Sequence, residues 1–218
     1  MSFIETITPD AADGETAAMY RRQQGAWGYV PNYAKVFGRR PEVMARWGAL
    51  LAEIKRPMDK RRFELATFAA AHELGNSACA LAHGRVLREF FADAEVVAIA
   101  EGRCAGVLDD AEQAVVRFAR QVARDASRIT ADAVAGLAAH GLDAGEIFDV
   151  AAAAAGRAFF TKLLDALGVQ IDSPFLAESD EWRRALVVGR PIDDRPPVAM
   201  PPARPAAAAF VEGERHVA

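Results

Sequence analysis

A cysteine and a histidine one helical turn apart are the residues of this chain best suited to chemistry. Asn76 or Ser77 can cap a helix, which places Cys79 in the first turn of that helix. Unpaired amide groups and the helix dipole favour a thiolate there, so we expect a lowered pKa for this thiol. His83 lies one turn further on the same face, within reach of the sulfur. These are the ingredients of an activated nucleophile.

A carboxylate upstream completes the group. Glu64 lies on the preceding helix, and Gly75 separates that helix from the one that holds Cys79. If the two helices pack antiparallel across this break, Glu64 can orient or protonate His83, as a third group does in general acid–base sites. The competing interpretation is structural, because free cysteine is among the most often buried residues and a Cys-x-x-x-His pair alone is not specific.

The elements that must position these residues are helices. Apolar residues recur at helical spacing along the chain, and the period-two alternation of strands does not persist anywhere. The spacing predicts helices over about 13–24, 32–37, 41–55, 59–74, 78–91, 93–102, 110–125, 130–140 and 143–167. Besides the Asn76 or Ser77 cap, capping residues are expected at Asp13, Asn32, Asp59, Asp109 or Asp110, and Thr130. The fold class is therefore all-α.

The last part of the chain has a different composition. Six of the eleven prolines fall at positions 191–205, and alanines follow. Such a segment lacks the periodic apolar face needed for its own core. Residues 189–218 are predicted to be either a disordered tail or an extended arm lying on another subunit, and Val198, Met200 and Phe210 favour the arm. Residues 1–188 form the helical domain.

The segment around Cys79 resembles the signature of the alkylhydroperoxidase D (AhpD) and carboxymuconolactone decarboxylase superfamily. That signature is a Glu on one helix, followed by Cys-x-x-Cys-x-x-x-His at the start of the next. Cys79 and His83 match its second cysteine and its histidine, and Glu64 lies at the expected distance upstream. Further similarity to the peroxidase-related branch is found at 28–32, 40–43, 108–133 and 141–169. The resemblance covers roughly residues 12–172, with the core signature at about 40–125, and implies an AhpD-like helical bundle.

One position departs from the signature. Asn76 stands where the peroxidase members carry their first cysteine. In the resembled enzymes the cysteine pair reduces a hydroperoxide and closes to a disulfide, while the glutamate and histidine relay protons. Here Cys79 can be oxidised to a sulfenic acid but needs a resolving thiol from elsewhere, and Cys104 is the only internal candidate.

The resemblance implies a peroxidase-related oxidoreductase with Cys79 as the redox thiol, His83 as base and Glu64 as proton relay. One alternative is a non-redox lyase or hydrolase of the decarboxylase type, in which Glu64 and His83 do acid–base work on a small carboxylate or lactone. A second alternative is a catalytically silent helical oligomer whose pocket or arm serves binding. Related proteins form trimers and hexamers, so a homo-oligomer is expected.

Other residues are candidates for the pocket border. His72 lies two turns after Glu64 on the same helix, and Asn76 lies beside the motif; a satisfied, partly buried side chain is the alternative for His72. Trp27, Tyr29 and Tyr33 cluster near the first turn and could wall a pocket or an interface, with core packing as the default.

Composition excludes several functions. Hydrophobic residues make up 52% of the 218 residues, the balance of a globular protein, and the net charge of −4 gives no basic field for nucleic acid. No apolar stretch is long enough for a bilayer. With two cysteines and no signal peptide before the core, we expect a cytoplasmic protein that acts on a small molecule. The sequence has no Gly-rich phosphate loop and no metal-ligand cluster, so no cofactor or metal is expected.

Overall fold

A computed structural model describes residues 2–202 of the chain. Within that range the protein consists of helices and irregular segments, with no β-strand. The α-helices are α1 (Gly14–Trp27), α2 (Asn32–Phe37), α3 (Pro41–Lys55), α4 (Lys60–Glu73), α5 (Ser77–Leu87), α6 (Asp93–Ala100), α7 (Asp110–Asp125), α8 (Ala131–Ala139), α9 (Ala144–Ala166) and α10 (Asp180–Leu186). Two short 3₁₀ helices span Ala126–Arg128 and Ser173–Ala177. The predicted all-α fold class is confirmed.

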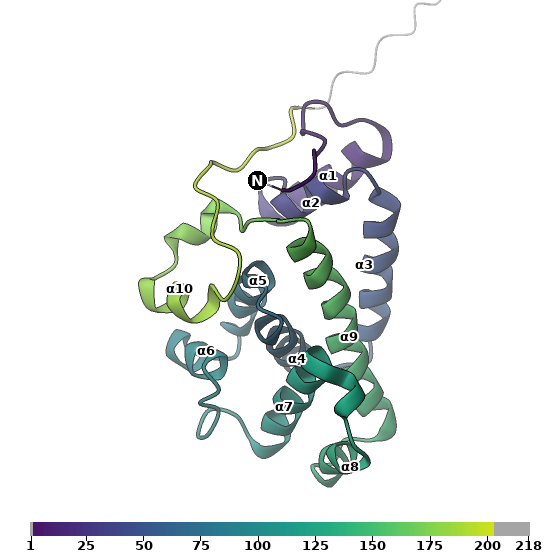
Figure 1. Ribbon diagram of the computed structural model, residues 1–218, viewed down its shortest axis with the longest axis vertical. Helices are drawn as coiled ribbons and strands as arrows, with labels where there is room; N and C mark the ends of the chain where they lie inside the picture. The colour runs from purple at the N-terminus through teal and green to yellow at the C-terminus, as the bar shows by residue number, and fades with distance from the viewer. Residues whose placement is uncertain (1, 203–218) are drawn as a thin grey trace, which may run out of the picture.

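Helix α4 lies at the centre of the molecule and packs against α5, α7 and α9 (Figure 1). All of its residues from 63 to 71 are buried, and most of them are apolar. A helix buried all round has little room for polar groups, and buried polar groups need hydrogen-bond partners. The polar side chains in this run, Glu64 and Thr67, therefore call for an explanation.

Side-chain caps fix the starts of most of the helices that build the interior. The predicted capping residues that accept a backbone hydrogen bond in the first turn are Asp59, Asn76, Asp109 and Thr130. Asp143, which was not predicted as a cap, does the same for α9. Two predicted caps are wrong. Asp13 precedes α1 without a capping hydrogen bond, and Asn32 is the first residue inside α2, where its N–H donates to Asp172 at 2.8 Å.

Helix α10 is an addition to the nine predicted helices. Ser179 caps it by accepting a hydrogen bond from the backbone N–H of Trp182. Trp182 and Leu186 are completely buried against the central helices. The segment is short, so its helical period is hard to recognise in the sequence.

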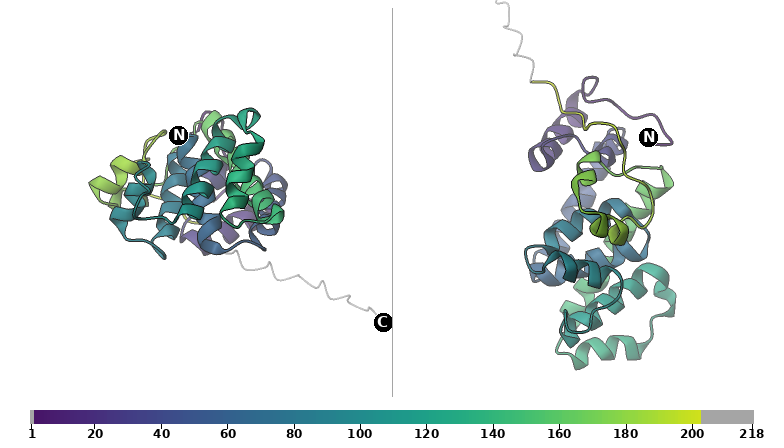
Figure 2. Two further views of the ribbon diagram at one scale, coloured as in Figure 1. Left: turned by 90° about the horizontal axis from the view of Figure 1, so that it is seen from below. Right: turned by 90° about the vertical axis from the view of Figure 1, so that its left-hand side faces the viewer.

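The proline-rich segment is an extended arm as far as residue 202, and it lies on its own chain. The N–H of Gly189 donates to the Ser77 hydroxyl at 2.7 Å, and the N–H of Val30 donates to the Val198 carbonyl at 2.9 Å. The Met200 side chain is buried. The arm thus runs from α5 to the end of the molecule that holds α1 and α2 (Figures 1 and 2). The rest of the predicted tail, including Phe210, lies outside the described residues.

Buried apolar side chains form two clusters. The larger surrounds α4 and includes parts of α5, α6, α7, α9 and α10. The smaller joins α1 and α2 to the C-terminal half of α9 and includes Cys79. Both clusters meet at the start of α5, so the predicted site lies between them.

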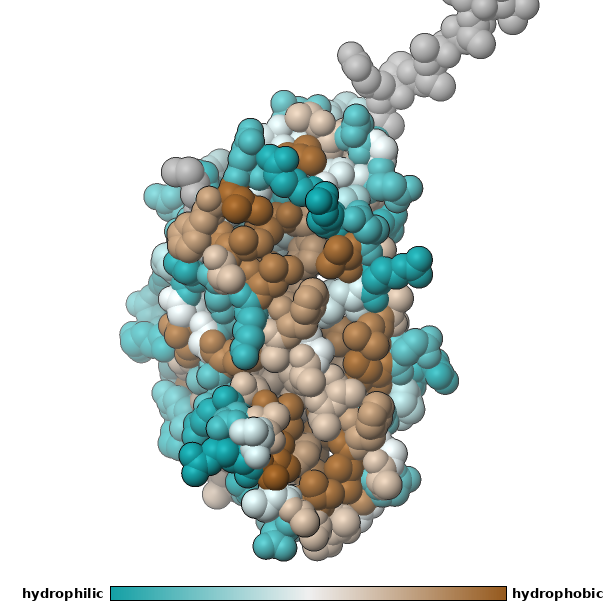
Figure 3. Space-filling view, turned by 45° about the vertical axis from the view of Figure 1, so that its right-hand side comes forward, coloured by the Kyte–Doolittle hydropathy of each residue, from teal (hydrophilic) through white to brown (hydrophobic). Residues whose placement is uncertain are grey.

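One face of the protein is strongly apolar. Figure 3 shows a broad apolar band on the side where α3 and α9 lie. Exposed large apolar residues on these helices are Val43, Leu50, Phe148 and Phe159. The homo-oligomer expected from the sequence stays a prediction, which sedimentation of the protein tests directly. Across residues 2–202, none of the helices has the length and apolar character that a membrane crossing requires.

Candidate functional site

A cavity of about 220 Å³ lies between α1, α3, α5 and α9 and reaches α4 at one side. Its wall includes Glu64 of α4, Cys79 and His83 of α5, and Arg157 of α9. The three residues singled out from the sequence therefore share one cavity. A fourth, Arg157, was not predicted.

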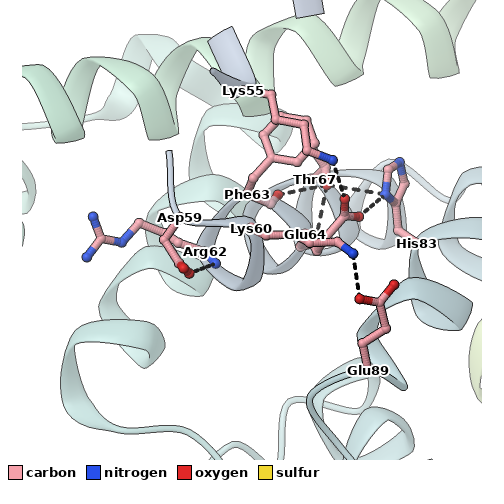
Figure 4. A network of polar contacts seen from close by, with 9 residues as sticks. All are labelled: Lys55, Asp59, Lys60, Arg62, Phe63, Glu64, Thr67, His83 and Glu89. Atoms are coloured by element: carbon pink, nitrogen blue, oxygen red, sulfur yellow. Dashed lines mark hydrogen bonds and ion pairs between the residues drawn. The ribbon is translucent and has the colours of Figure 1, made fainter. Parts of the chain in front are cut away.

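Glu64 and His83 form a buried pair on one side of the cavity (Figure 4). The Glu64 Oε2 atom lies 2.6 Å from His83 Nδ1, and only 4% of the Glu64 side chain is exposed. Its other oxygen, Oε1, accepts a hydrogen bond from Lys55 Nζ at 3.2 Å. The Thr67 hydroxyl donates to the Phe63 carbonyl within α4 and lies 3.4 Å from the same histidine nitrogen. Each oxygen of the buried carboxylate thus has a partner.

The electrostatics of this pair fix its protonation. Burial works to raise the pKa of Glu64, but the hydrogen bond from His83 and the charge of Lys55 outweigh it, so the pKa falls below its ordinary value. Burial and the positive charge of Arg157 lower the pKa of His83. The stable form at neutral pH is therefore a carboxylate beside a neutral imidazole.

This protonation determines which histidine nitrogen faces the cavity as a base. An ionised carboxylate only accepts hydrogen bonds, so His83 Nδ1 must carry the proton that it donates to Glu64. The second nitrogen, Nε2, then has a free lone pair, and no hydrogen bond reaches it from residues 2–202. In Figure 4 this nitrogen points away from Glu64. A neutral imidazole with this nitrogen free is able to accept a proton, and the role of His83 as a base stays a prediction.

Cys79 lies in the first turn of α5, as predicted. Its backbone N–H donates to the Asn76 side chain at 2.9 Å, and its Sγ lies 3.8 Å from Arg157 Nη1. The predicted pKa is wrong in direction. Burial raises the pKa of the Cys79 thiol, and the nearby arginine only partly offsets this. The helix terminus is not enough, because the sulfur is removed from water.

Arg157 is the unpredicted member of the site. Only 5% of this residue is exposed, and it forms no ion pair with any described residue. Its Nε atom has no hydrogen-bond partner in that part of the chain. The signal that could have found it is a single charged residue directly after the apolar run 150–156 of a long helix.

Aromatic rings form the rest of the wall. Trp47 and Phe160 stack with ring centroids 4.2 Å apart and planes 14° apart, and Tyr33 meets Phe160 edge-on at 5.4 Å. Trp27 and Tyr33 line the cavity, which is the less favoured of the two alternatives considered for them. Tyr29 is buried and does not line it.

The two predicted border residues lie elsewhere. His72 packs on α10, where its Nε2 lies 3.0 Å from the Ala185 carbonyl, so it is a satisfied, partly buried histidine. Asn76 is buried as the cap of α5, and its amide donates to the Thr161 carbonyl at 3.4 Å. Neither side chain lines the cavity.

The two cysteines pack in different parts of the core. Both are free thiols. Cys104 follows α6 and packs against the larger apolar cluster, whereas Cys79 belongs to the smaller one. The structure does not bring the only internal candidate for a resolving thiol into the cavity wall.

No protein-family profile matches this sequence, and no curated protein is detectably similar to it. Solved structures of similar fold exist. An uncharacterised peroxidase-related protein with an AhpD core from Ralstonia eutropha JMP134 has a TM-score of 0.67 at 18% identity, covering 87% of this chain and 98% of its own. A peroxidase-related protein from Silicibacter sp. TM1040 has a TM-score of 0.68 at 17% identity, with coverages of 81% and 95%. A debrominase in complex with 2,3,4-tribromopyrrole has a TM-score of 0.65 at 17% identity, with coverages of 85% and 98%. The resemblance stated from the sequence is thereby confirmed for the fold, which is AhpD-like.

Proposed function

We propose that this protein is a thiol-dependent oxidoreductase of the AhpD-like, peroxidase-related type. Cys79 is the redox-active thiol, His83 is the base that takes its proton, and Glu64 holds His83 in the required tautomer. The observation that carries the proposal is that all three line one cavity while the Glu64–His83 pair leaves Nε2 free. The peroxidase-related proteins of similar fold support the same class of chemistry.

The oxidation step is a displacement at oxygen. His83 Nε2 accepts the thiol proton, and the Cys79 sulfur attacks the outer oxygen of a hydroperoxide. The S–O bond forms as the O–O bond breaks, so sulfur is oxidised to a sulfenic acid and the peroxide is reduced. The leaving alkoxide takes the proton from His83 and departs as an alcohol. Arg157 next to the sulfur stabilises the transient thiolate against the cost of burial.

Recycling requires a thiol from outside the chain. Asn76 replaces the partner cysteine, and Cys104 is packed against another part of the core. A first external thiol converts the sulfenic acid to a mixed disulfide with loss of water, and a second releases Cys79 and an external disulfide.

The direct test is consumption of an organic hydroperoxide with dithiothreitol as reductant. We expect turnover in the wild type and in Cys104→Ser, and none above background in Cys79→Ser. His83→Gln should keep the thiol but react slowly, by about 100-fold or more, because general base catalysis is lost. Equal rates for the wild type and Cys79→Ser would reject the proposal.

A second variant tests the role of the missing cysteine. Asn76→Cys restores a thiol at the cap of α5. The rate of turnover under excess hydroperoxide should therefore rise, while the rate at which Cys79 is first oxidised should equal that of the wild type. Asn76→Ser is the matched control, because it keeps a capping oxygen without a thiol. A gain in both variants would show that the cap, and not the thiol, limits the rate.

The cavity also supports a non-redox acid–base reaction. The Glu64–His83 pair is complete without the sulfur, and the Cys79 thiol is neutral at rest because burial raises its pKa. The debrominase of similar fold is in complex with 2,3,4-tribromopyrrole, which is not a hydroperoxide. Turnover of a small lactone or carboxylate that survives Cys79→Ser and disappears in His83→Gln would favour this function over the first.

A further inference from the structure

We propose that the cavity binds a small planar aromatic anion, with the negative group held by Arg157 and the ring held against the aromatic side chains of the wall. This inference rests on the proposed function, because it concerns the same cavity. It names the class of ligand that this cavity takes. It concerns binding, and so it can be tested without any thiol chemistry.

The first argument is charge. Arg157 is almost completely buried, and its nearest polar neighbour is the sulfur of a thiol that is neutral at rest. The buried carboxylate of the same cavity already serves His83 and Lys55. A buried charge without a partner is costly, and it persists where a ligand supplies the missing one. The guanidinium has a planar fork of donors, which suits a carboxylate or a similar oxyanion.

The other acid of the wall does not neutralise this arginine. Asp172 accepts a hydrogen bond from the backbone of Asn32 at 2.8 Å, and the charge of Lys35 acts on it. Burial raises the pKa of Asp172 to about 6, so this carboxylate is still mostly ionised at neutral pH, but no ion pair joins it to Arg157. Arg157 therefore remains the group that an incoming anion meets.

The second argument is the shape and chemistry of the wall. Trp47 and Phe160 stack almost parallel, and the Arg157 guanidinium lies 5.4 Å and 5.8 Å from their ring centroids. A flat ring bound beside them gains stacking contacts while its acidic group reaches the guanidinium. The volume of about 220 Å³ lies below the range of roughly 300–1,000 Å³ for drug-sized ligands, which points to a single ring.

The cavity contains its own spectroscopic probes. Trp27 and Trp47 line it, whereas the third tryptophan, Trp182, belongs to α10 and is buried in the larger apolar cluster. Binding of a ring should therefore change the tryptophan fluorescence and can be checked by calorimetry. The protein for this experiment is full-length Cys79→Ser, which removes the reactive thiol and leaves Arg157 in place.

The probes are benzoate, its neutral analogue benzamide, and cyclohexanecarboxylate, which has the charge without the flat ring. We expect benzoate to bind about tenfold or more tightly than either of the other two, the ratio that one hydrogen-bonded charge contact or one stacking contact provides. Adding Arg157→Met should abolish the preference for benzoate over benzamide, while Arg157→Lys should keep part of it. Arg117→Met, at an exposed position of α7, is the matched control and should change nothing.

Three outcomes would overturn the inference: no binding of benzoate at millimolar concentration, equal binding of benzoate and benzamide, or benzoate binding unchanged in a folded Arg157→Met protein. Circular dichroism of each variant shows whether it is folded. If Arg157→Met does not fold, Arg157→Lys provides the decisive comparison. These outcomes are independent of the hydroperoxide assay, since they are measured in a protein that has no thiol at residue 79.

Discussion

The two sides of the cavity differ in whether their buried charge has a partner. On one side the Glu64 carboxylate has a partner for each oxygen, the imidazole of His83 and the ammonium of Lys55. On the other side Cys79 and Arg157 face each other at 3.8 Å, and the arginine forms no ion pair within residues 2–202. Both sides are buried, so the difference lies in the partners and not in the exposure to water.

This difference suggests that the two sides have different tasks. A satisfied buried network stabilises one arrangement of its members, which is what a base needs to keep its tautomer. An unsatisfied buried charge costs folding free energy and contributes only when a ligand or a charged intermediate arrives. We infer that the Glu64–His83 side maintains the geometry of the site and that the Cys79–Arg157 side meets the changing charges of the reaction.

The largest expected effect comes from removing the carboxylate. Glu64→Gln replaces the carboxylate that accepts from His83 and Lys55 by a neutral amide, and weakening a buried charge-assisted hydrogen bond in this way costs about 2 kcal/mol of unfolding free energy. Arg157→Met removes a charge that has no buried partner, so the unfolding free energy should stay within about 1 kcal/mol of wild type or rise. Urea unfolding of the two variants measures both values.

The comparison between the two sides would fail if Arg157→Met lost more stability than Glu64→Gln. That result would mean that the arginine contributes packing or hydrogen bonds worth more than its desolvation cost. Arg62→Met is a suitable reference for the loss of an exposed ion pair, since Arg62 pairs with Glu146 at the surface.

The sequence was sufficient to predict the Glu64–His83 side of the cavity, but it was not sufficient to predict the Cys79–Arg157 side. Helical period and capping residues predicted α4 and α5, and the antiparallel packing of these helices brings Glu64 to His83. These are local signals with one long-range step. The burial of Arg157 depends on the packing of α9 against α3, so its place after an apolar run marks it as a candidate but does not distinguish it from a surface arginine.

The error about the thiol has the same origin. The position of Cys79 at the start of α5 was predictable, and the helix terminus does favour an anion there. Its burial follows from segments distant in sequence, namely α1, α2 and α9, which complete the smaller apolar cluster. Desolvation then outweighs the local field and raises the pKa.

The next effect is the response of the paired side to acid. The pKa of His83 is lowered from its ordinary value of 6.5, and the pKa of Glu64 is lowered from 4.5. In both cases the unfolded chain binds its proton at a higher pH than the folded protein does. The stability is therefore complete above pH 6.5 and is lost as the pH falls, first in the window below 6.5 and then below 4.5.

Unfolding midpoints in urea from pH 7 to pH 4 measure this loss. His83→Gln should flatten the part of the curve that lies just below pH 6.5. His72 also has a lowered pKa because of burial and contributes in the same direction, so His72→Gln is the necessary companion variant. If His72→Gln alone removes the whole slope, the acid response does not come from the paired side of the cavity.

The smallest effect is an alkaline one, and it belongs to the other side. Burial raises the pKa of the Cys79 thiol above its ordinary value of 9.0, so the folded protein keeps this proton after the unfolded chain has lost it. Stability then falls as the pH rises above 9.0, by at most about 1.4 kcal/mol per pH unit for one group. Burial raises the pKa of three tyrosines as well, and their loss of stability adds to that of the thiol as the pH approaches 10.

Between pH 9 and pH 10 the thiol and the tyrosines both contribute, so the difference between variants isolates the thiol. Cys79→Ser should reduce the slope of the unfolding free energy in this interval, whereas Cys104→Ser, which changes the half-buried thiol outside the cavity, should leave it intact. Arg157→Met should steepen the loss, because the arginine is the group that opposes the effect of burial on this sulfur. A slope that is the same in Cys79→Ser and in the wild type would mean that the thiol releases its proton at the same pH in the folded protein and in the unfolded chain. Arg157 would then fully offset the effect of burial on this sulfur, and the difference between the two sides of the cavity would disappear.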